Sequence, residues 1–383
     1  MPLHRLRAVF MRGGTSKALM FHRRDLPPRQ QDWSPIFLAA MGAPDPNGRQ
    51  LDGMGGGLSS VSKVCIIGPP THPEADVDYT FAQIGVDSAT VDYGANCGNM
   101  SSAVGPFAVD EGLVNAPTEG PVTVRIHNTN THKLIVAHFM VDSGRSAVGG
   151  ALAIDGVAGT GAPIRLEFRD LAGARTGRLL PTGEPLQTLS VPGGRIVRAS
   201  LVDAANPCIF VDAANLGLMG NEVPEDIEQN TALMADLEAL RRQASILMGL
   251  TPDLEAAAAS RSVPFIGLVA RPGAWRTRSG LDRSATDADI AVRMLSGGTP
   301  HRAIPITSAL CVAVACRTPG TLPAELCGSA AGPLRIGHAS GTVIVEAEPD
   351  PRLGRVRHAS VYRTARRLFQ GEVLYSEPAG DPS

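Results

Sequence analysis

The sequence contains almost no lysine. Of its 35 cationic residues only three are lysine, at Lys17, Lys63 and Lys133, and the rest are arginine. Arginine can carry a surface charge as well as lysine does, but only lysine can release its proton near neutral pH when it is partly buried. A retained lysine is therefore a candidate general base. Chance retention of ordinary side chains, with their stems packed on apolar neighbours, is the alternative for Lys17 and Lys63.

Other absences exclude whole classes of protein. A net charge of −2 leaves no basic excess that could neutralise nucleic-acid phosphates. No stretch is long and apolar enough for a membrane span, and residues 1–14 lack the apolar core and cleavage site of a secretory signal. Six cysteines in 383 residues are too sparse for a disulfide framework. The sequence thus predicts a cytoplasmic protein that binds neither nucleic acid nor a membrane.

Glycine and proline are abundant and indicate many short elements. The 42 glycines and 30 prolines separate short apolar runs, which favours strands over long helices, and the chain length suits two domains. Strands are expected at 8–12, 63–67, 78–84, 122–127, 134–141 and 164–168 in the first half, and at 187–191, 196–202, 208–211, 265–270, 289–294, 334–337, 341–347 and 358–364 in the second. An amphipathic helical region with a break at Asn230 is expected over 224–250.

Two further segments, 98–111 and 307–317, have the pattern of helices that are apolar nearly all round. Helices without a polar face are expected inside a protein, so each half would form a sheet curled around one buried helix. Both helices begin with small polar residues, which are Gly98, Asn99, Thr307 and Ser308. Their first backbone N–H groups are then open to an anion. Two such helix ends facing one cleft would hold a substrate with two or more carboxylates.

The strongest local motif is DYGANCGNMSSAVGPFAV, in which Cys97 directly precedes the first of these helices. The helix dipole and the free N–H groups at such a position favour the thiolate form of a cysteine. Gly94 and Gly98 on either side allow a ligand to approach the backbone closely. We interpret Cys97 as a thiol that transfers or orients a proton. A structural cysteine in a tight turn is the alternative.

Three further loops could bind carboxylates. RGGTSK at 12–17 pairs two glycines with hydroxyl groups and can present several N–H groups to an anion. GHASG at 337–341 lies between two expected strands, and RTRSG at 276–280 carries Arg278, which could clamp a carboxylate. Each loop alone is weak evidence, because a glycine-rich turn, a hairpin turn and a solvated basic loop would have the same composition.

The sequence has no pattern for a metal or an organic cofactor. His127, His132 and His138 lie on an expected hairpin, and their spacing matches no zinc site. The glycine runs follow neither the nucleotide P-loop order nor the dinucleotide fingerprint, and no GxSxG is present. We therefore expect no metal and no cofactor.

Taken together and in this order, RGGTSK, DGMGGGLSSVSK, VDYGANCGN followed by VGPFA, and GHASG resemble the PrpF family from about Arg5 to Leu374. Members of that family include 2-methylaconitate cis-trans isomerase, aconitate isomerases and 4-oxalomesaconate tautomerase. The resemblance implies an α+β fold of the diaminopimelate epimerase type, with two pseudo-symmetric domains that each curl a mixed or antiparallel sheet around a central helix. The N-terminal domain would span 1–185, completed by 355–383, and the C-terminal domain would span 186–354.

The resemblance also implies a site. Lys63 and Cys97 would be the catalytic pair in a cofactor-independent proton transfer on unsaturated di- and tricarboxylates. The substrate-binding residues would be Thr15, Ser16, Asn96, Gly98, Asn99, Arg278, Thr307, Ser308, Ser340 and Gly341. In an allylic 1,3-shift a base removes a proton beside a carboxylate, N–H dipoles stabilise the dienolate, and a proton returns to another carbon.

One departure from other enzymes of this fold is informative. Epimerases of the fold have a thiol at each central helix, but here Pro305 and Ile306 stand where the second thiol would be. Cys311 comes too late, inside the expected helix. A symmetric two-thiol racemase is therefore disfavoured, and the resemblance assigns the place of the lost thiol to Lys63.

Three functions remain open from the sequence. The first is isomerisation of an unsaturated tricarboxylate of the aconitate or 2-methylaconitate type, by an allylic shift or a cis-trans change. The second is 4-oxalomesaconate tautomerisation. The third is carboxylate binding without catalysis, against which the joint presence of Lys63 and Cys97 argues. The partner is in each case a small di- or tricarboxylate. The sequence leaves open the exact substrate, the direction of reaction, the role of Cys97 and the oligomeric state, a homodimer included.

Overall fold

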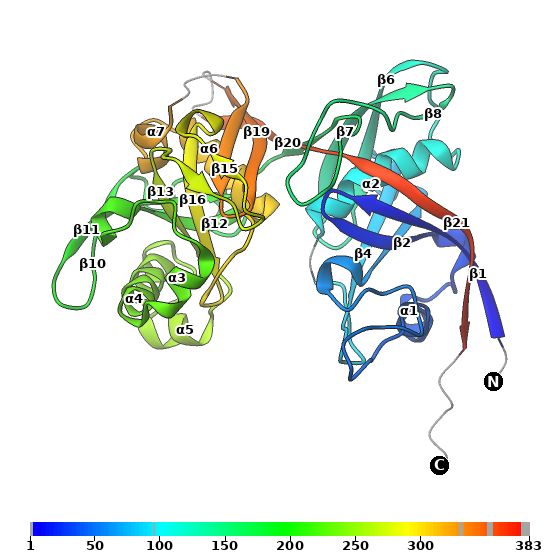
Figure 1. Ribbon diagram of the computed structural model, residues 1–383, viewed down its shortest axis with the longest axis horizontal. Helices are drawn as coiled ribbons and strands as arrows, with labels where there is room; N and C mark the ends of the chain where they lie inside the picture. The colour runs from blue at the N-terminus through cyan, green and yellow to red at the C-terminus, as the bar shows by residue number, and fades with distance from the viewer. Residues whose placement is uncertain (1–2, 95, 329–331, 351–354, 377–383) are drawn as a thin grey trace, which may run out of the picture. The chain divides into compact units, whose positions relative to one another are not determined.

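The computed structural model describes residues 3–94, 96–328, 332–350 and 355–376. Contacts divide the chain into two compact units, a first unit formed by Met1–Glu167 with Arg363–Ser383 and a second unit formed by Phe168–Tyr362 (Figure 1). The domain boundary proposed at 185/186 thus lies inside the second unit. The segment after Glu167 is hydrogen-bonded within that unit, for example from Gly173 N to Asp203 O at 2.8 Å.

The sheet of the first unit contains strands from both ends of the chain. Its strands are β1 (Leu3–Gly13), β2 (Ser16–His22), β3 (Lys63–Gly68), β4 (Val77–Ile84), β5 (Val91–Asp92), β6 (Gly120–Asn128), β7 (Lys133–Asp142), β8 (Arg145–Ser146), β9 (Ile164–Arg169) and β21 (Ala365–Ser376). β1 pairs antiparallel with both β2 and β21. β2 pairs parallel with β3, β3 pairs antiparallel with β4, and β4 pairs antiparallel with β5 and parallel with β6. β6 then forms an antiparallel hairpin with β7.

The helix α2 (Gly98–Asp110) is the buried centre of the first unit, which confirms the expectation from its composition. Every residue from Met100 to Val109 is buried. Small residues allow close packing, because a Cβ added at Gly105 would lie 2.7 Å from the ring of Phe139 on β7. The helix α1 (Trp33–Met41) packs in a separate core cluster with alternate residues of the sheet. Since helices cover both faces, β3 is buried at every position.

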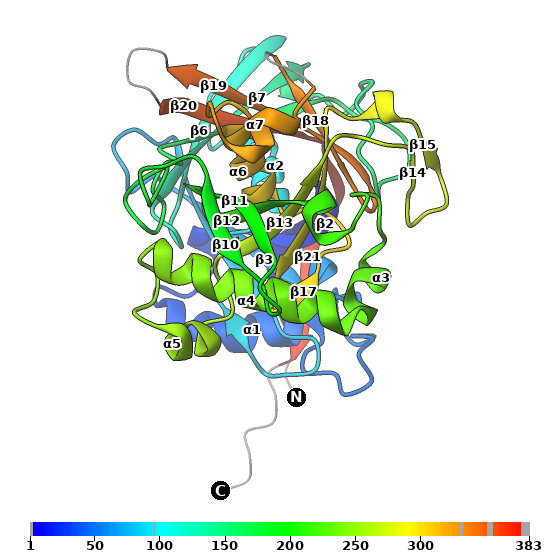
Figure 2. The same cartoon turned by 90° about the vertical axis from the view of Figure 1, so that its left-hand side faces the viewer.

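The second unit repeats this arrangement. Its strands are β10 (Gln187–Ser190), β11 (Ile196–Ala204), β12 (Asn206–Asp212), β13 (Phe265–Ala270), β14 (Trp275–Arg276), β15 (Asp282–Arg283), β16 (Ile290–Ser296), β17 (Thr299–Pro300), β18 (Leu334–His338), β19 (Gly341–Asp350) and β20 (Arg355–Arg363). Its helices are α3 (Pro224–Gln229), α4 (Thr231–Leu247), α5 (Leu254–Ala259), α6 (Ile306–Cys316) and α7 (Leu322–Leu326). The buried helix is α6, which contacts β11, β12 and β19, and α4 covers the other face of β11 to β13 (Figure 2).

The break expected at Asn230 is confirmed. Its side chain accepts a hydrogen bond from Leu233 N (3.0 Å) and caps the start of α4, directly after α3 ends. Short 3-10 turns complete the secondary structure at Arg23–Asp25, Gln30–Asp32, Ser59–Val61, Ala213–Leu216 and Ala285–Asp287.

An ion-pair cluster holds the C-terminal end of α2 to the sheet. Glu111 follows the helix, and its side chain is only 6% exposed. It accepts hydrogen bonds from Arg7 (2.8 Å) and Arg367 (2.7 Å) and lies 3.0 Å from His22 Nε2. Burial opposes ionisation of Glu111, but the hydrogen bonds from His22 and Arg367 and the charges of Arg367 and Arg7 outweigh it. The pKa of Glu111 therefore lies below its ordinary value.

Glu111→Gln should lower the free energy of unfolding by about 2 kcal/mol at pH 7, because it removes the carboxylate that Arg7 and Arg367 share and leaves Arg367 with the more distant pair to Asp110. A carboxyl whose pKa is lowered by folding stabilises the native state above its unfolded pKa and loses that contribution as the pH falls through the folded pKa. The difference between wild type and variant in urea unfolding should therefore shrink below about pH 4.

The matched control is Glu372→Gln, which removes an exposed ion pair with Arg5 on the same sheet. Exposed pairs contribute little, so this change should leave the unfolding free energy nearly unaltered. Equal effects of the two substitutions would contradict a special role for the Glu111 cluster.

Candidate active site

Lys63 is a buried lysine at the first position of β3, with 8% of its surface exposed. Strand register places it directly opposite Gln83 on β4, and its Nζ donates a hydrogen bond to Gln83 Oε1. Nζ also lies 5.1 Å from the centroid of the Phe81 ring, within the range of a cation–π contact. Within the described part of the chain, no carboxylate forms an ion pair with Lys63. The amine is therefore buried beside neutral groups.

The glycine-rich loop before Lys63 is fixed by the buried side chain of Gln50. Gln50 Nε2 donates to Ser62 Oγ (2.8 Å), and Gly57 N donates to Gln50 Oε1 (3.0 Å). Glycine is required for this packing, because Gly57 has a φ of +71° and a Cβ at Gly55 would lie 2.3 Å from the Gln50 side chain. The run DGMGGG thus positions the start of β3.

Cys97 is the N-cap residue of α2, and it is partly exposed. Its carbonyl accepts hydrogen bonds from Ser101 N (2.9 Å) and Ser101 Oγ (3.0 Å), and Ser101 Oγ also lies 3.3 Å from Asn96 Oδ1. No described side chain caps the start of α2. The N–H groups of Gly98 and Asn99 are therefore available to a bound anion.

The buried thiol of Cys65 indicates that Lys63 and Cys97 lie around one region of the first unit. Burial raises the pKa of Cys65 well above its ordinary value, Cys97 adds to this rise, and a hydrogen bond with Tyr79 and the charge of Lys63 oppose it. Cys65 Sγ lies 3.9 Å from Tyr79 OH. Burial also raises the pKa of Tyr79, with Cys65 and Cys97 adding to the rise and a hydrogen bond with Ser101 opposing it. Lys63 and Cys65 share one face of β3, so we infer that this face is turned toward the start of α2.

RGGTSK forms the turn between β1 and β2 and packs on the start of α2. Asn99 Nδ2 donates to Thr15 Oγ1 (3.1 Å), and Arg363 Nε donates to Asn99 Oδ1 (3.2 Å). Gly14 has a φ of +52°, and a Cβ there would lie 2.3 Å from Asn99 Oδ1, so glycine is required. Ser16 is buried at the start of β2. Burial lowers the pKa of Arg363 to about 10, and this residue places a buried cation beside the predicted ligands.

In the second unit, Arg278 and Ser340 lie close together. Arg278 N donates to Ala339 O (3.0 Å), and Gly341 follows with a φ of +141°. The guanidinium of Arg278 already pairs with Glu225, so its charge is balanced within the unit. Arg278 is therefore a weaker carboxylate clamp than its position in the sequence suggests.

Thr307 and Ser308 lie in the first turn of α6, after the N-cap residue Pro305. Thr307 is exposed, whereas Ser308 is fully buried and its Oγ has no hydrogen-bond partner among the described residues. Cys311 lies inside the helix, and its Sγ is 3.6 Å from Val202 O. The start of α6 therefore has no thiol equivalent to Cys97, as expected.

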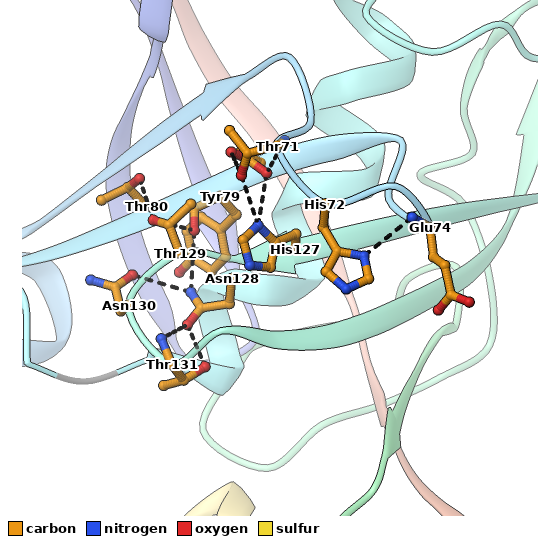
Figure 3. A network of polar contacts seen from close by, with 11 residues as sticks. Thr71, His72, Glu74, Tyr79, Thr80, His127, Asn128, Thr129, Asn130 and Thr131 are labelled. Atoms are coloured by element: carbon orange, nitrogen blue, oxygen red, sulfur yellow. Dashed lines mark hydrogen bonds and ion pairs between the residues drawn. The ribbon is translucent and has the colours of Figure 1, made fainter.

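His127 and His138 of the β6–β7 hairpin belong to separate polar networks, and the ring centroid of His132 lies 6.1 Å from that of His127. His127 Nδ1 lies 2.9 Å from Asp78 Oδ1, and Thr71 Oγ1 donates to Asp78 Oδ2 at 2.7 Å (Figure 3). His138 Nε2 instead lies 3.2 Å from Glu167 Oε2. Across residues 3–94, 96–328, 332–350 and 355–376, no group of three or more His, Cys, Asp or Glu side chains could hold a metal ion.

Several residues around the site were not indicated by sequence patterns, namely Gln83, Tyr79, Ser101 and Arg363. Gln83 could have been found from the two expected strands 63–67 and 78–84. When these strands pair antiparallel so that the start of the first meets the end of the second, Gln83 lies opposite Lys63. Arg363 comes from the far end of the chain, and nothing in its local sequence connects it with the motifs of the N-terminal half.

The chain matches the family model described as PrpF protein over residues 3–376. It is 42% identical over 380 residues to the 3-methylitaconate isomerase of Eubacterium barkeri, with 98% of each chain covered. It is 37% identical over 390 residues to a 2-methyl-aconitate isomerase of Shewanella oneidensis, again with 98% of each chain covered. It is also 38% identical over 369 residues to the (4E)-oxalomesaconate Delta-isomerase of Novosphingobium sp. strain KA1, with 96% of each covered.

Solved structures confirm the fold class expected from the sequence. The crystal structure of methylitaconate-delta-isomerase has a TM-score of 0.90 and 39% identity, with 100% of each chain covered. A structure from Agrobacterium radiobacter K84 that is named for proline racemase has a TM-score of 0.50 at 14% identity, with 98% of this chain and 94% of that chain covered, and shows the fold alone. The fold is α+β and of the diaminopimelate epimerase type.

In the native protein, iodoacetamide should modify Cys97 and Cys327 first. These two thiols are partly exposed, whereas the other four cysteines are buried: Cys65, Cys208, Cys311 and Cys316. Peptide mass spectrometry after a short exposure measures the pattern, and Cys97→Ser should remove one of the two labels without changing the other. Early labelling of Cys65 in the folded protein would contradict the burial of this side chain on β3.

Proposed function

We propose that this chain, which belongs to the PrpF protein family, isomerises an unsaturated tricarboxylate of the aconitate or 2-methylaconitate type by moving a proton. The protein is an isomerase, as its relatives at 42%, 37% and 38% identity over nearly their whole length are named. The tricarboxylate class is proposed from the name of the 2-methyl-aconitate isomerase. Because 3-methylitaconate is a dicarboxylate, the 3-methylitaconate isomerase supports the wider class of unsaturated di- and tricarboxylates. The proposed reaction needs no cofactor.

The observation that carries the proposal is the placement of Lys63. Its amine is buried on the face of β3 that we infer is turned toward Cys97 and the start of α2, and its hydrogen-bond partner there is an amide oxygen. A lysine that can release its proton in such a place is suited to act as a general base. The N–H groups beside it at the start of α2 are suited to the carboxylate of a substrate.

In the proposed reaction, Lys63 in its amine form removes a proton from the carbon next to a substrate carboxylate. The electron pair left behind spreads over the double bond and the carboxylate as a dienolate. The ammonium then gives a proton to the other end of the three-carbon unit, so the double bond moves and the charges balance. A shift on one face of the substrate needs only this one base.

Cys97 and the groups around Asn99 would stabilise the dienolate. Charge develops on the carboxylate oxygens as the proton leaves, and fixed N–H donors aimed at those oxygens lower the barrier. The backbone N–H groups of Gly98 and Asn99 and the Thr15 hydroxyl have suitable positions at the start of α2. We assign Cys97 a supporting role of this kind, with direct proton transfer by the thiol as the alternative.

A tautomerase that acts on 4-oxalomesaconate is the second candidate, favoured by the relative from Novosphingobium at 38% identity. The same residues would serve it, so the substrate must be tested directly. Trans-aconitate, 2-methylaconitate, itaconate analogues and 4-oxalomesaconate should be offered separately, with ultraviolet absorbance and proton NMR as readouts. Turnover of 4-oxalomesaconate alone would select the second candidate, and binding without turnover of any compound would select a carboxylate-binding protein.

We also propose a cytoplasmic setting. No helix in the described part of the chain is long and apolar enough to cross a membrane. The six cysteines are all free thiols, which supports a reducing cytoplasm. We propose a homodimer as the state to test by light scattering.

Lys63→Arg should lower turnover on the true substrate by about a hundredfold or more, because arginine keeps the charge but cannot accept a proton at neutral pH. Steady-state kinetics on the substrate that the screen identifies measures the loss. Lys17→Arg is the matched control, since Lys17 on β2 lies over the ring of Phe10 on β1 and away from the proposed base. Near-normal turnover of Lys63→Arg would show that only the positive charge at position 63 is needed, and that Lys63 is not the base.

Cys97→Ser separates the two roles of the thiol. If Cys97 stabilises the dienolate, isomerisation and the exchange of substrate protons with deuterated water should slow together, which is the expected result. If Cys97 returns the proton, isomerisation should nearly stop while exchange continues, because Lys63 can still remove a proton. Proton NMR in deuterated water gives both rates, and unimpaired isomerisation would leave Cys97 a structural residue.

A further inference from the structure

The side chain of Gln83 contacts the amine of Lys63 because of strand register. Lys63 and Gln83 are direct partners in the antiparallel pair of β3 and β4, so their side chains leave the same face of the sheet. Lys63 Nζ donates to Gln83 Oε1. Gln83 is thus the polar side chain closest to the proposed base in the hydrogen-bond network of the first unit.

The orientation of the Gln83 amide is fixed from its other side. Nε2 donates to the carbonyl oxygens of Ser62 (2.9 Å), Ser59 (3.1 Å) and Ile84 (3.3 Å). Three carbonyl oxygens can only accept hydrogen bonds, so the NH₂ group must face them and the amide oxygen must face Lys63. The amine therefore meets an acceptor that cannot turn away.

The loop before β3 provides two of these three carbonyl groups, and the third, of Ile84, is at the end of β4. Ser59 and Ser62 lie in and just after the short turn Ser59–Val61, and Gln50 holds Ser62 Oγ at 2.8 Å. The DGMGGGLSSVSK motif thus fixes Gln83 through its backbone carbonyls as well as carrying Lys63. This gives a physical reason for the length and glycine content of a motif that does not follow the order of a nucleotide-binding loop.

The charged and titratable groups around this contact are few. On the side away from Lys63, Gln83 is opposite Asp92 of β5, whose Oδ1 accepts a hydrogen bond from Gly94 N (2.7 Å). Toward α2 the titratable groups are Cys65, Tyr79 and Cys97. In strand register, Gln83 therefore lies between Lys63 and Asp92.

We propose that Gln83 is a positioning residue that aims the Lys63 amine at the substrate and lets it lose its proton. An amide oxygen accepts a hydrogen bond from an ammonium and from a neutral amine alike, so it orients Lys63 in both protonation states. A carboxylate at the same place would stabilise the ammonium and hold the proton on Lys63. The proposal rests on the proposed role of Lys63 as the base.

Two substitutions at Gln83 test the proposal with opposite expected shifts. Gln83→Glu places a carboxylate against Lys63, and Gln83→Met keeps the volume but removes the acceptor. Gln243→Glu is the matched control, because Gln243 Nε2 also donates to backbone carbonyls, of Ser190 (2.7 Å) and Ala239 (3.1 Å), but lies in the second unit. Thermal unfolding checks that each variant is folded.

The chain offers a direct readout, because it has only three lysines. Protein labelled with ¹³C at lysine Cε should give three titrating signals, and Lys63→Arg identifies the one from Lys63. In Gln83→Glu the titration midpoint of this signal should rise by about 1–3 pH units, and the pH at which kcat/KM is half-maximal should rise with it. In Gln83→Met the midpoint should fall, and kcat should drop about tenfold with a smaller change in KM.

A folded Gln83→Glu or Gln83→Met variant in which the Lys63 signal keeps its wild-type midpoint would overturn the proposal. Equal shifts in Gln243→Glu would do the same, because the effect would then not be local. If Gln83→Glu does not fold, Gln83→Met decides alone. If the midpoint shifts as expected but kcat/KM does not follow it, the positioning of Lys63 is supported and its role as the base fails, so the two ideas are separated.

Discussion

The amine of Lys63 is buried without a carboxylate partner among the described residues, and this is the constraint on which the site depends. Moving a charge out of water costs several kcal/mol unless other groups compensate. Here the compensating groups are a fixed amide oxygen and an aromatic ring face. Neutral groups of this kind hold a proton on lysine less firmly than a carboxylate would. In a chain that uses arginine almost everywhere else, a lysine at position 63 is then explained, because arginine could not release a proton there.

The two units use the same architecture but not the same chemistry. Each places a sheet between a buried helix of small residues and an outer helix, α2 and α1 in the first unit and α6 and α4 in the second. The first buried helix begins after Cys97, and the second begins after Pro305. Cys311 is fully buried within α6. The symmetry of the fold therefore does not extend to a pair of thiols. The group proposed to act together with Cys97 is Lys63, which lies on a strand, β3, and not at the start of α6.

Much of this arrangement could be predicted from short patterns. The expected strands and both apolar helices are present, with ends that differ by a few residues. They could be predicted because the spacing of apolar residues and the positions of glycine depend on local structure. β2 and α1 were not expected, and neither were α5, α7 and the short strands β5, β8, β14, β15 and β17. β21 was not named as a strand, but it lies in the 355–383 segment that was expected to complete the N-terminal domain, and it pairs with β1. β2 is buried at every position except Lys17 and follows a hydroxyl-rich turn. β20 and β21 form one run in the sequence but are separate strands interrupted at Thr364, whose carbonyl accepts a hydrogen bond from Gly14 N (2.9 Å). The contacts of Gln83 and Arg363 depend on pairing between strands, which no single segment encodes.

The central claim is that the amine of Lys63 is the base, and it can be tested on the wild-type enzyme. The pH dependence of kcat/KM reports the ionisation of the essential base in the free enzyme. The ¹³C signal of Lys63 Cε reports the ionisation of that amine directly. The account predicts that activity rises with the same midpoint as the Lys63 titration. Midpoints that differ by more than about one pH unit would contradict it, because another group would then be removing the proton.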